Sequence, residues 1–221
     1  MNLLVALLFV FAGYFIGAIP TGLVVGAYGY DTDIRSQGSG NIGFTNTLRV
    51  LGPLAAAIVL TLDVAKGLAA VVVTSLIFSG APTFISSPAV ISIQDSLVVV
   101  FVSAAILIGN NFSIYLRFQG GKGIGVASGI IIGFSPVIAI ILLIIWILVI
   151  VFTRYVSLAS ITIAAGFPIL MFLFFDLWPY EVFSLLAAIL AISRHRANIK
   201  RLFLGTELKF GQQSENISSD S

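Results

Sequence analysis

A polar stretch, Ser39-Gly40-Asn41-Ile42-Gly43-Phe44-Thr45-Asn46-Thr47-Leu48-Arg49, separates two long apolar runs near the start of this chain. Its glycines allow backbone N–H groups to turn toward one point, and Arg49 ends it with a fixed cation. Donors that converge beside a cation suit a phosphate or another oxyanion. The alternative interpretation is an ordinary turn between two membrane helices. The candidate donors are Ser39, Gly40, Asn41, Gly43, Thr45 and Asn46.

The composition is that of an integral membrane protein. Only 9% of the 221 residues are charged, and the mean hydropathy is +1.13, whereas soluble domains carry about 25% charged residues. There is no cysteine and a single histidine, which excludes a thiolate nucleophile and the usual multi-histidine metal site. The net charge of +2 gives no reason to expect a nucleic-acid partner. We expect no metal and no cofactor.

Seven apolar runs are expected to cross the lipid bilayer as helices, because about 20 apolar residues suffice for one crossing. Together they form one all-α, membrane-embedded domain over residues 1–210, and the polar tail 211–221 is expected to be disordered. Pro20 and Gly22 should loosen the second half of the first run. The fourth run is too short to cross untilted, so it should begin within the membrane. The predicted spans are about 3–28, 54–78, 97–112, 124–134, 137–152, 158–175 and 179–192.

The positive charges predict the orientation. Of the 11 Lys and Arg residues, only Lys66 lies inside a predicted span. The others fall in the first, third and fifth connections or in the C-terminal segment. Because Lys and Arg favour the cytoplasmic side, we expect the N-terminus outside, the C-terminus in the cytoplasm, and every polar stretch on the cytoplasmic face of the cell membrane.

A second polar stretch contains Gly120-Gly121-Lys122-Gly123 at the start of the short fourth run. Glycine lets the backbone approach an anion, Lys supplies a point charge, and the following helix offers free N–H groups. The stretch lacks the spacing of a P-loop, so it does not indicate an ATP site. The alternative interpretation is that Lys122 is only a topological anchor.

Two ionisable residues, Asp63 and Lys66, lie three apart on one face of the second span. Ionisable residues inside a membrane are costly and usually pair or line a polar cavity. The pair therefore either orients the cytoplasmic loops or serves as a structural ion pair.

His195 lies in the basic run Arg194-His195-Arg196-Ala197-Asn198-Ile199-Lys200-Arg201. Nearby cations lower a histidine pKa, so we expect a neutral ring that donates a hydrogen bond or acts as a base. Asn198 shares its helical face. The alternative interpretation, contact with lipid headgroups, fits Arg194, Lys200 and Arg201 better than His195.

This inventory of glycine loops, cations and neutral donors on one face suits phosphate binding. It fits acyl or phosphoryl transfer to a phosphorylated, membrane-associated substrate, driven by positioning and charge stabilisation. A small transporter or channel for an organic anion is the rival class, but its pathway would need polar groups through the membrane depth. A structural membrane subunit is the third class, and it leaves the loop chemistry without a purpose.

Several short runs carry a family resemblance: Gly17-Ala18-Ile19-Pro20-Thr21-Gly22, the stretch 38–49, Asp63 to Gly67, Gly120-Gly121-Lys122-Gly123, Arg154-Tyr155-Val156-Ser157-Leu158, the stretch 194–202 and Gly205-Thr206-Glu207. In this order they resemble the bacterial acyl-phosphate:glycerol-3-phosphate acyltransferases of the PlsY type, over nearly the whole chain except the tail. The resemblance implies a seven-span enzyme that transfers a fatty acyl group from acyl phosphate to glycerol 3-phosphate. The products are lysophosphatidic acid and phosphate, in the first acylation step of phospholipid synthesis. It also implies that no metal, nucleotide, acyl-CoA or acyl carrier protein is used.

The resemblance also implies roles for the polar residues. Our own hypothesis for the mechanism is that the acyl chain enters sideways from the bilayer and that the donor's own phosphate accepts the proton, with His195 as the alternative base. Catalysis would rest on Ser39, Arg49, Lys122, His195 and Asn198. Acyl phosphate would be held by Ser39, Gly40, Asn41, Gly43, Thr45, Asn46, Gly120, Gly121, Lys122 and His195. Glycerol 3-phosphate would be held by Arg49, Lys122 and Asn198.

The chain departs from this family at a few positions. The family usually has Gly-His-x-Phe-Pro before the glycine-Lys loop, and this chain has Gly109-Asn110-Asn111-Phe112-Ser113. Phe44 stands where Ala is usual, and Gln119 replaces a common Lys. We expect these differences to affect the exit of the third span, the local charge and the acyl-chain preference.

Overall fold

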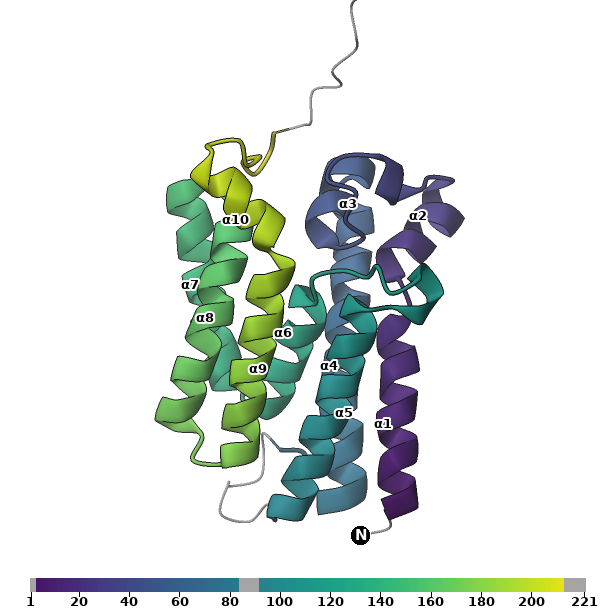
Figure 1. The fold of residues 1–221 in the computed structure, drawn as a ribbon, viewed down its shortest axis with the longest axis vertical. Helices are drawn as coiled ribbons and strands as arrows, with labels where there is room; N and C mark the ends of the chain where they lie inside the picture. Colours follow the sequence, from purple (N-terminus) through teal and green to yellow (C-terminus); the bar gives the residue numbers. More distant parts are fainter. Residues whose placement is uncertain (1–2, 84–91, 213–221) are drawn as a thin grey trace, which may run out of the picture.

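A computed structural model describes residues 3–83 and 92–212, and over these ranges every regular element is a helix (Figure 1). The prediction of an all-α protein is confirmed. The predicted disordered tail lies outside the described residues from residue 213 onward, as does the middle of the 80–96 connection. The elements are α1 (Leu3–Ala18), α2 (Thr21–Tyr30), η1 (Ile34–Ser36), α3 (Phe44–Leu51), α4 (Pro53–Ser79), α5 (Ile93–Asn111), η2 (Ile114–Leu116), α6 (Ile124–Phe134), α7 (Pro136–Thr153), α8 (Val156–Phe174), α9 (Trp178–Arg194) and α10 (Arg196–Phe203).

Four to six stretches of the described residues are long and apolar enough to cross a membrane. Four are single stretches: α4, α7, α8, and the stretch Ile93–Leu116 that holds α5. Two more are bent pairs, α1 with α2 at 45° and α9 with α10 at 58°. The 11 residues of α6 rise only about 16 Å, roughly half of a 30 Å hydrocarbon core. The predicted count of seven therefore depends on α6.

The break between α1 and α2 falls at Pro20, where the sequence predicted a loosened helix. Two carbonyls exposed by the break receive side-chain donors: Ser113 Oγ bonds Ala18 O, and Lys66 Nζ lies 2.7 Å from Ile19 O. Asp63 accepts hydrogen bonds from Thr21 and, at 3.2 Å, from Lys66. The Asp63–Lys66 pair thus serves the broken helix, as buried polar groups in a membrane must find internal partners.

Helices α4 and α6 approach so closely that glycine is required at their contact. A Cβ on Gly67 would overlap Val126 O, and a Cβ on Gly129 would overlap Val64 O. The same holds for α1 and α5, where Gly17 meets Ile106 O. Small residues at such contacts let the helices approach closely and pack by van der Waals forces. Close packing matters here because lipid is itself apolar, so the hydrophobic effect does not drive helices together within it.

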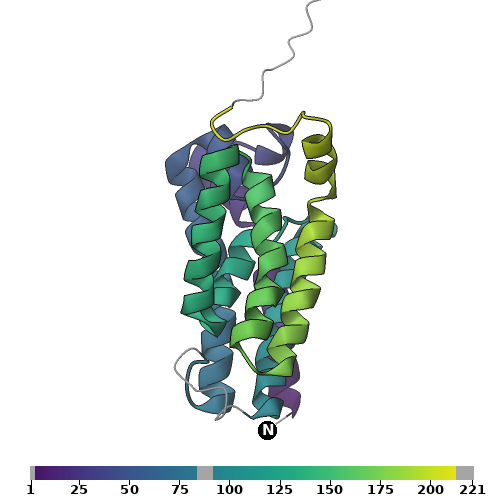
Figure 2. The ribbon, with the colours of Figure 1, turned by 90° about the vertical axis from the view of Figure 1, so that its left-hand side faces the viewer.

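These contacts place α6 in the middle of the bundle. In Figure 1 the chain leaves η2, crosses the bundle at mid-height and enters α6 well below α3 and α10. In Figure 2 helices α7, α8 and α9 lie side by side as a separate layer, which agrees with the α7–α8 and α8–α9 contacts. The loop before α6 is therefore recessed between the two parts of the bundle.

The α4–α6 contact predicts a sharp difference between two glycines. Gly129→Ala should destabilise the fold by about 1–3 kcal/mol, because the new methyl group has to displace backbone. Gly29→Ala is the matched control, since a Cβ there meets nothing within 4 Å, and it should cost no stability. Thermal unfolding of the purified variants in detergent micelles measures both. Equal melting temperatures for the two variants would contradict this account of the packing.

Candidate active site

The first polar loop is docked on α2 and organised by Asn46. A Cβ on Gly22 would overlap Ile42 O, so α2 needs glycine where the loop lies. The buried Asn46 accepts from Ser39 N at 2.7 Å and donates to Ile34 O at 2.8 Å and Gln37 O at 3.2 Å. Both of its amide hydrogens are engaged. The prediction that Asn46 donates to phosphate is therefore corrected: its side chain holds Ser39 in place.

Most of the other predicted donors of this loop border one cavity. Asn41 Oδ1 accepts from Gly43 N at 3.0 Å, so the N–H of Gly43 is also engaged within the loop. Gly40 is not among the lining residues, and its φ of +68° shows that it shapes the turn. The lining residues of this loop and of α3 include Ser39, Asn41, Gly43, Thr45, Asn46 and Arg49.

The glycine-Lys loop is held differently from the prediction. Gly120 N donates to Asn111 O at 3.2 Å and Gly121 N to Asn110 O at 2.9 Å, so neither N–H is free for an anion. Their carbonyls accept from Arg194, at 2.8 Å from Nη2 to Gly120 O and 3.2 Å from Nε to Gly121 O. Arg194 thus holds this loop in place, whereas the alternative interpretation of the sequence had assigned it to contact with lipid headgroups. Glycine is needed at position 120 because a Cβ on Gly120 would overlap Asn110 O.

Lys122 begins a chain of charge-assisted hydrogen bonds. Lys122 Nζ donates to Asn198 Oδ1 at 2.6 Å, and Asn198 Nδ2 donates to Glu207 Oε1 at 2.7 Å. Arg201 Nε reaches Glu207 Oε2 at 2.6 Å. Burial lowers the pKa of Lys122 to about 8, with Glu207 opposing and Arg201, Arg49 and Arg194 adding to the effect. Lys122 and Asn198 are brought together as predicted.

Glu207 is the site residue that the sequence analysis did not select. It lines the cavity. Burial acts to raise the pKa of its carboxyl, but hydrogen bonds from Asn198 and Arg201, together with the Arg201 charge, hold that pKa below its usual value. Two features of the sequence could have pointed to Glu207. It belongs to the run Gly205-Thr206-Glu207, which carries part of the family resemblance, and it is a lone carboxylate a few residues after a basic run.

His195 lies in the bend between α9 and α10, outside both helices, and it is buried. Its Nδ1 is 2.8 Å from Ala191 O. A carbonyl can only accept, so Nδ1 carries the hydrogen and Nε2 of the neutral ring is an acceptor. Burial and then the Lys122 ammonium lower the pKa of His195 to about 4. The ring is neutral near pH 7 as predicted, but in that state it has no free donor.

The segment 206–212 closes the polar end of the cavity. Arg49 Nη2 lies 3.4 Å from Leu208 O, and Phe210 N donates to Arg154 O at 2.7 Å. The Lys209 ammonium lies 5.7 Å from the centre of the Tyr155 ring. These contacts join α3 and the α7–α8 turn to the segment 206–212, which follows α10.

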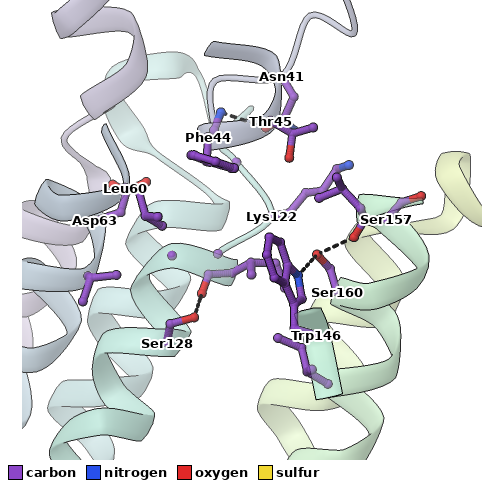
Figure 3. A pocket seen from close by; sticks show the side chains of 18 of the residues that line it. Asn41, Phe44, Thr45, Leu60, Asp63, Lys122, Ser128, Trp146, Ser157 and Ser160 are labelled. Carbon is purple, nitrogen blue, oxygen red and sulfur yellow. Dashed lines mark hydrogen bonds between the residues drawn. The ribbon is translucent and has the colours of Figure 1, made fainter. Parts of the chain in front are cut away.

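One cavity of about 570 Å³ joins this polar cluster to an apolar groove. In Figure 3, Lys122 lies between Asn41 and Thr45 on one side and Trp146 and Ser160 on the other. Trp146 Nε1 is 3.5 Å from Ser160 Oγ. Below this level the groove follows one face of α6 and one face of α7. Its apolar lining includes Leu60, Val64, Ile131, Ile132, Pro136, Ala139, Ile140, Leu143 and Ile163.

The groove is open toward the surrounding lipid. Leu60, Ile140 and Leu143 line it and are nevertheless exposed, by 37%, 57% and 54%. Within the described ranges, no cluster of three or more His, Asp or Glu side chains is placed to hold a metal ion. The arrangement can therefore hold a molecule with an anionic head and an apolar chain.

Comparisons with known proteins agree with this geometry. The family model for glycerol-3-phosphate acyltransferases matches residues 7–205. The glycerol-3-phosphate acyltransferase 2 of Moorella thermoacetica is 42% identical over 208 residues, which is 94% of this chain and 99% of that protein. The glycerol-3-phosphate acyltransferase of Thermoanaerobacter sp. (strain X514) is 41% identical over 210 residues, 95% of this chain and 98% of that protein.

Two solved structures share the fold. They are crystal structures of PlsY (YgiH), an integral membrane glycerol 3-phosphate acyltransferase, in its glycerol 3-phosphate form and its lysophosphatidic acid form. Their TM-scores are 0.83 and 0.80 at 32% and 31% identity, over 93% of this chain and 96% and 95% of theirs. Because the family model covers most of its length and the Moorella and Thermoanaerobacter relatives are 42% and 41% identical to it, this chain belongs to the glycerol-3-phosphate acyltransferase family.

Proposed function

We propose that this protein acylates glycerol 3-phosphate with acyl phosphate as the donor, giving lysophosphatidic acid and inorganic phosphate. The observation that carries the proposal is the single cavity that joins cations and hydroxyl donors to an apolar groove open to lipid. A membrane-borne acyl donor needs both parts, because its chain stays in the bilayer while its phosphate has to be held beside the second substrate. Membership of the family supports the acceptor and the reaction type.

In the proposed mechanism the protein positions two phosphates and stabilises their charge. Ser39 and Thr45 hold the donor phosphate together with Lys122, and Arg49 and Asn198 hold glycerol 3-phosphate. The glycerol hydroxyl oxygen attacks the acyl carbonyl carbon, the new C–O ester bond forms, and the C–O bond to phosphate breaks. Lys122 offsets the charge that grows on the leaving phosphate.

The hydroxyl proton passes to the donor phosphate in this proposal. The leaving phosphate oxygen gains negative charge as its bond to the acyl carbon breaks, so its basicity rises during the reaction. Burial and Lys122, by contrast, lower the pKa of His195 to about 4. Neutral His195 can accept a hydrogen bond at Nε2 from the glycerol hydroxyl that does not react, and so orient the acceptor.

We also propose the seven-span topology, with the site on the cytoplasmic side of the cell membrane. Helix α6 brings the number of crossings to seven, and it begins within the membrane thickness. The N-terminal end and α10 lie at opposite ends of the molecule in Figure 1, which agrees with an odd number of crossings. The cation-rich segments around α3 and α10 lie at the same end as each other, as the positive-inside rule requires.

The assay that tests the function also tests the rival transporter. Purified protein in lipid vesicles should release phosphate from acyl phosphate only when glycerol 3-phosphate is present, with one lysophosphatidic acid formed per phosphate. Uptake of labelled glycerol 3-phosphate should stay at the level of empty vesicles. Uptake without ester formation would support the transporter and reject the enzyme.

The pKa of Lys122 predicts an alkaline limb. The ammonium binds phosphate and is lost as the pH rises through about 8 in the free enzyme, so kcat/KM should fall above that pH. Lys122→Arg should lower the maximum rate, because a planar fork does not replace a compact ammonium. It should also abolish the limb, because a guanidinium stays protonated throughout this pH range. A limb that survives in Lys122→Arg would assign it to another group.

Variants of His195 separate the two proton routes. A general base contributes about 10²–10⁴-fold, so loss of a catalytic base would cost that much kcat in both His195→Asn and His195→Ala. We expect a loss of less than about tenfold in His195→Asn, which keeps an acceptor, and a larger loss in His195→Ala. Measurements of kcat against pH with saturating substrates decide this. Equal losses of about a thousandfold would make His195 the base.

The topology predicts opposite labelling at two exposed positions of this cysteine-free chain. Asp176→Cys, between α8 and α9, should react with an impermeant thiol reagent from outside the cell. Lys200→Cys on α10 should react only after the membrane is opened. Labelling of both from the same side would contradict the proposed orientation.

A further inference from the structure

The side chain of Asn110 faces the cavity without a hydrogen-bonding partner. Asn110 lies in the last turn of α5, is 7% exposed and lines the cavity. Its backbone carbonyl accepts from Gly121 N at 2.9 Å. No described residue forms a hydrogen bond with its amide group, although buried amides almost always have one. A ligand group in the cavity would supply that partner.

The next residue shows what a structural asparagine looks like in the same helix. Asn111 is 0% exposed, and its Nδ2 donates to Leu107 O at 2.8 Å. It is not among the residues that line the cavity. Asn111 Oδ1 is also buried without a hydrogen-bond partner among the described residues, but it lies away from the cavity, so of the two adjacent asparagines only Asn110 can reach a molecule bound there.

Asn110 lies where the two polar loops meet. A Cβ built on Gly121 would be 3.4 Å from Asn110 Oδ1 and 3.7 Å from Ile42 Cγ1, so both side chains converge beside the glycine-Lys loop. Ile42 is the middle residue of the first loop, between Asn41 and Gly43. Lys122, the residue after Gly121, is the cation of the glycine-Lys loop, and it also lines the cavity. The carboxylate on the same wall, Asp63, is already paired with Lys66.

We infer that Asn110 is a further binding residue for a substrate phosphate, to which its Nδ2 donates a hydrogen bond between the two loops. The inference rests on the proposed function and deepens it. Asn110 lies beside Ile42 of the first loop, whose residues Ser39 and Thr45 are assigned to the donor phosphate. Asn110 is therefore assigned to the same phosphate, and the kinetics of the two substrates test this assignment against the phosphate of glycerol 3-phosphate.

Two substitutions of nearly equal size test the chemistry. Asn110→Leu should raise the KM for acyl phosphate tenfold to a hundredfold, the value of a hydrogen bond to a charged group, while the KM for glycerol 3-phosphate changes less. Asn110→Asp should be worse, because a carboxylate repels phosphate. If Asn110 acted only through its shape, Asn110→Asp would raise the KM less than Asn110→Leu, since Asp matches the shape of Asn more closely. Asn111→Ala is the matched control, which should lower the melting temperature and leave both KM values within twofold.

A binding measurement keeps this inference separate from the reaction. Inorganic phosphate should raise the melting temperature of the wild-type protein and of Asn111→Ala, and this protection should be lost in Asn110→Leu and Asn110→Asp. A wild-type protein without transfer activity would reject the proposed function and leave this test intact. Unchanged KM values and full protection by phosphate in Asn110→Leu would overturn the inference.

Discussion

In the core of a bilayer an unpaired backbone N–H or C=O has no water to bond, and this constraint shapes the protein more than any other. The site needs loops and a broken helix at membrane depth, and each of them exposes backbone. Side chains satisfy it: Asn46 for the first loop, Arg194 for the glycine-Lys loop, and Lys66 for the break in the first span. Many of the polar residues that look like ligands are therefore structural.

That division decides what remains for chemistry. Lys122, Arg49 and Asn110 reach the cavity from the glycine-Lys loop, α3 and α5. Arg49 and Asn110 are held by helical backbone, and Arg194 fixes the backbone just before Lys122. Such groups lose little freedom when a substrate binds, so positioning can supply much of the proposed rate enhancement. The apolar groove needs no comparable precision, because lipid around its open side is as apolar as its walls.

The positions of the helices were predictable, and the roles of the donors were not. Hydropathy placed the second span at 54–78, against Pro53–Ser79 observed for α4, and Pro20 marked the break in the first span. Both signals are local. The hydrogen bonds that Asn46, Gly120 and Gly121 donate depend instead on carbonyl groups that the fold brings close from other segments of the chain. For the same reason, no local pattern distinguished Asn110 from Asn111, and none identified Glu207 as a residue of the cavity.

The cation cluster also bears on the path of the proton. Lys122 is surrounded by Arg49, Arg194 and Arg201, with Glu207 as the carboxylate that opposes them. Burial and the Lys122 ammonium disfavour a charged imidazole, so they weaken His195 as a base. The cation cluster also stabilises the phosphate as it leaves with two negative charges. Phosphate is the more favourable proton acceptor in the proposed mechanism because its oxygen gains negative charge as the C–O bond breaks, whereas the ring of His195 gains none.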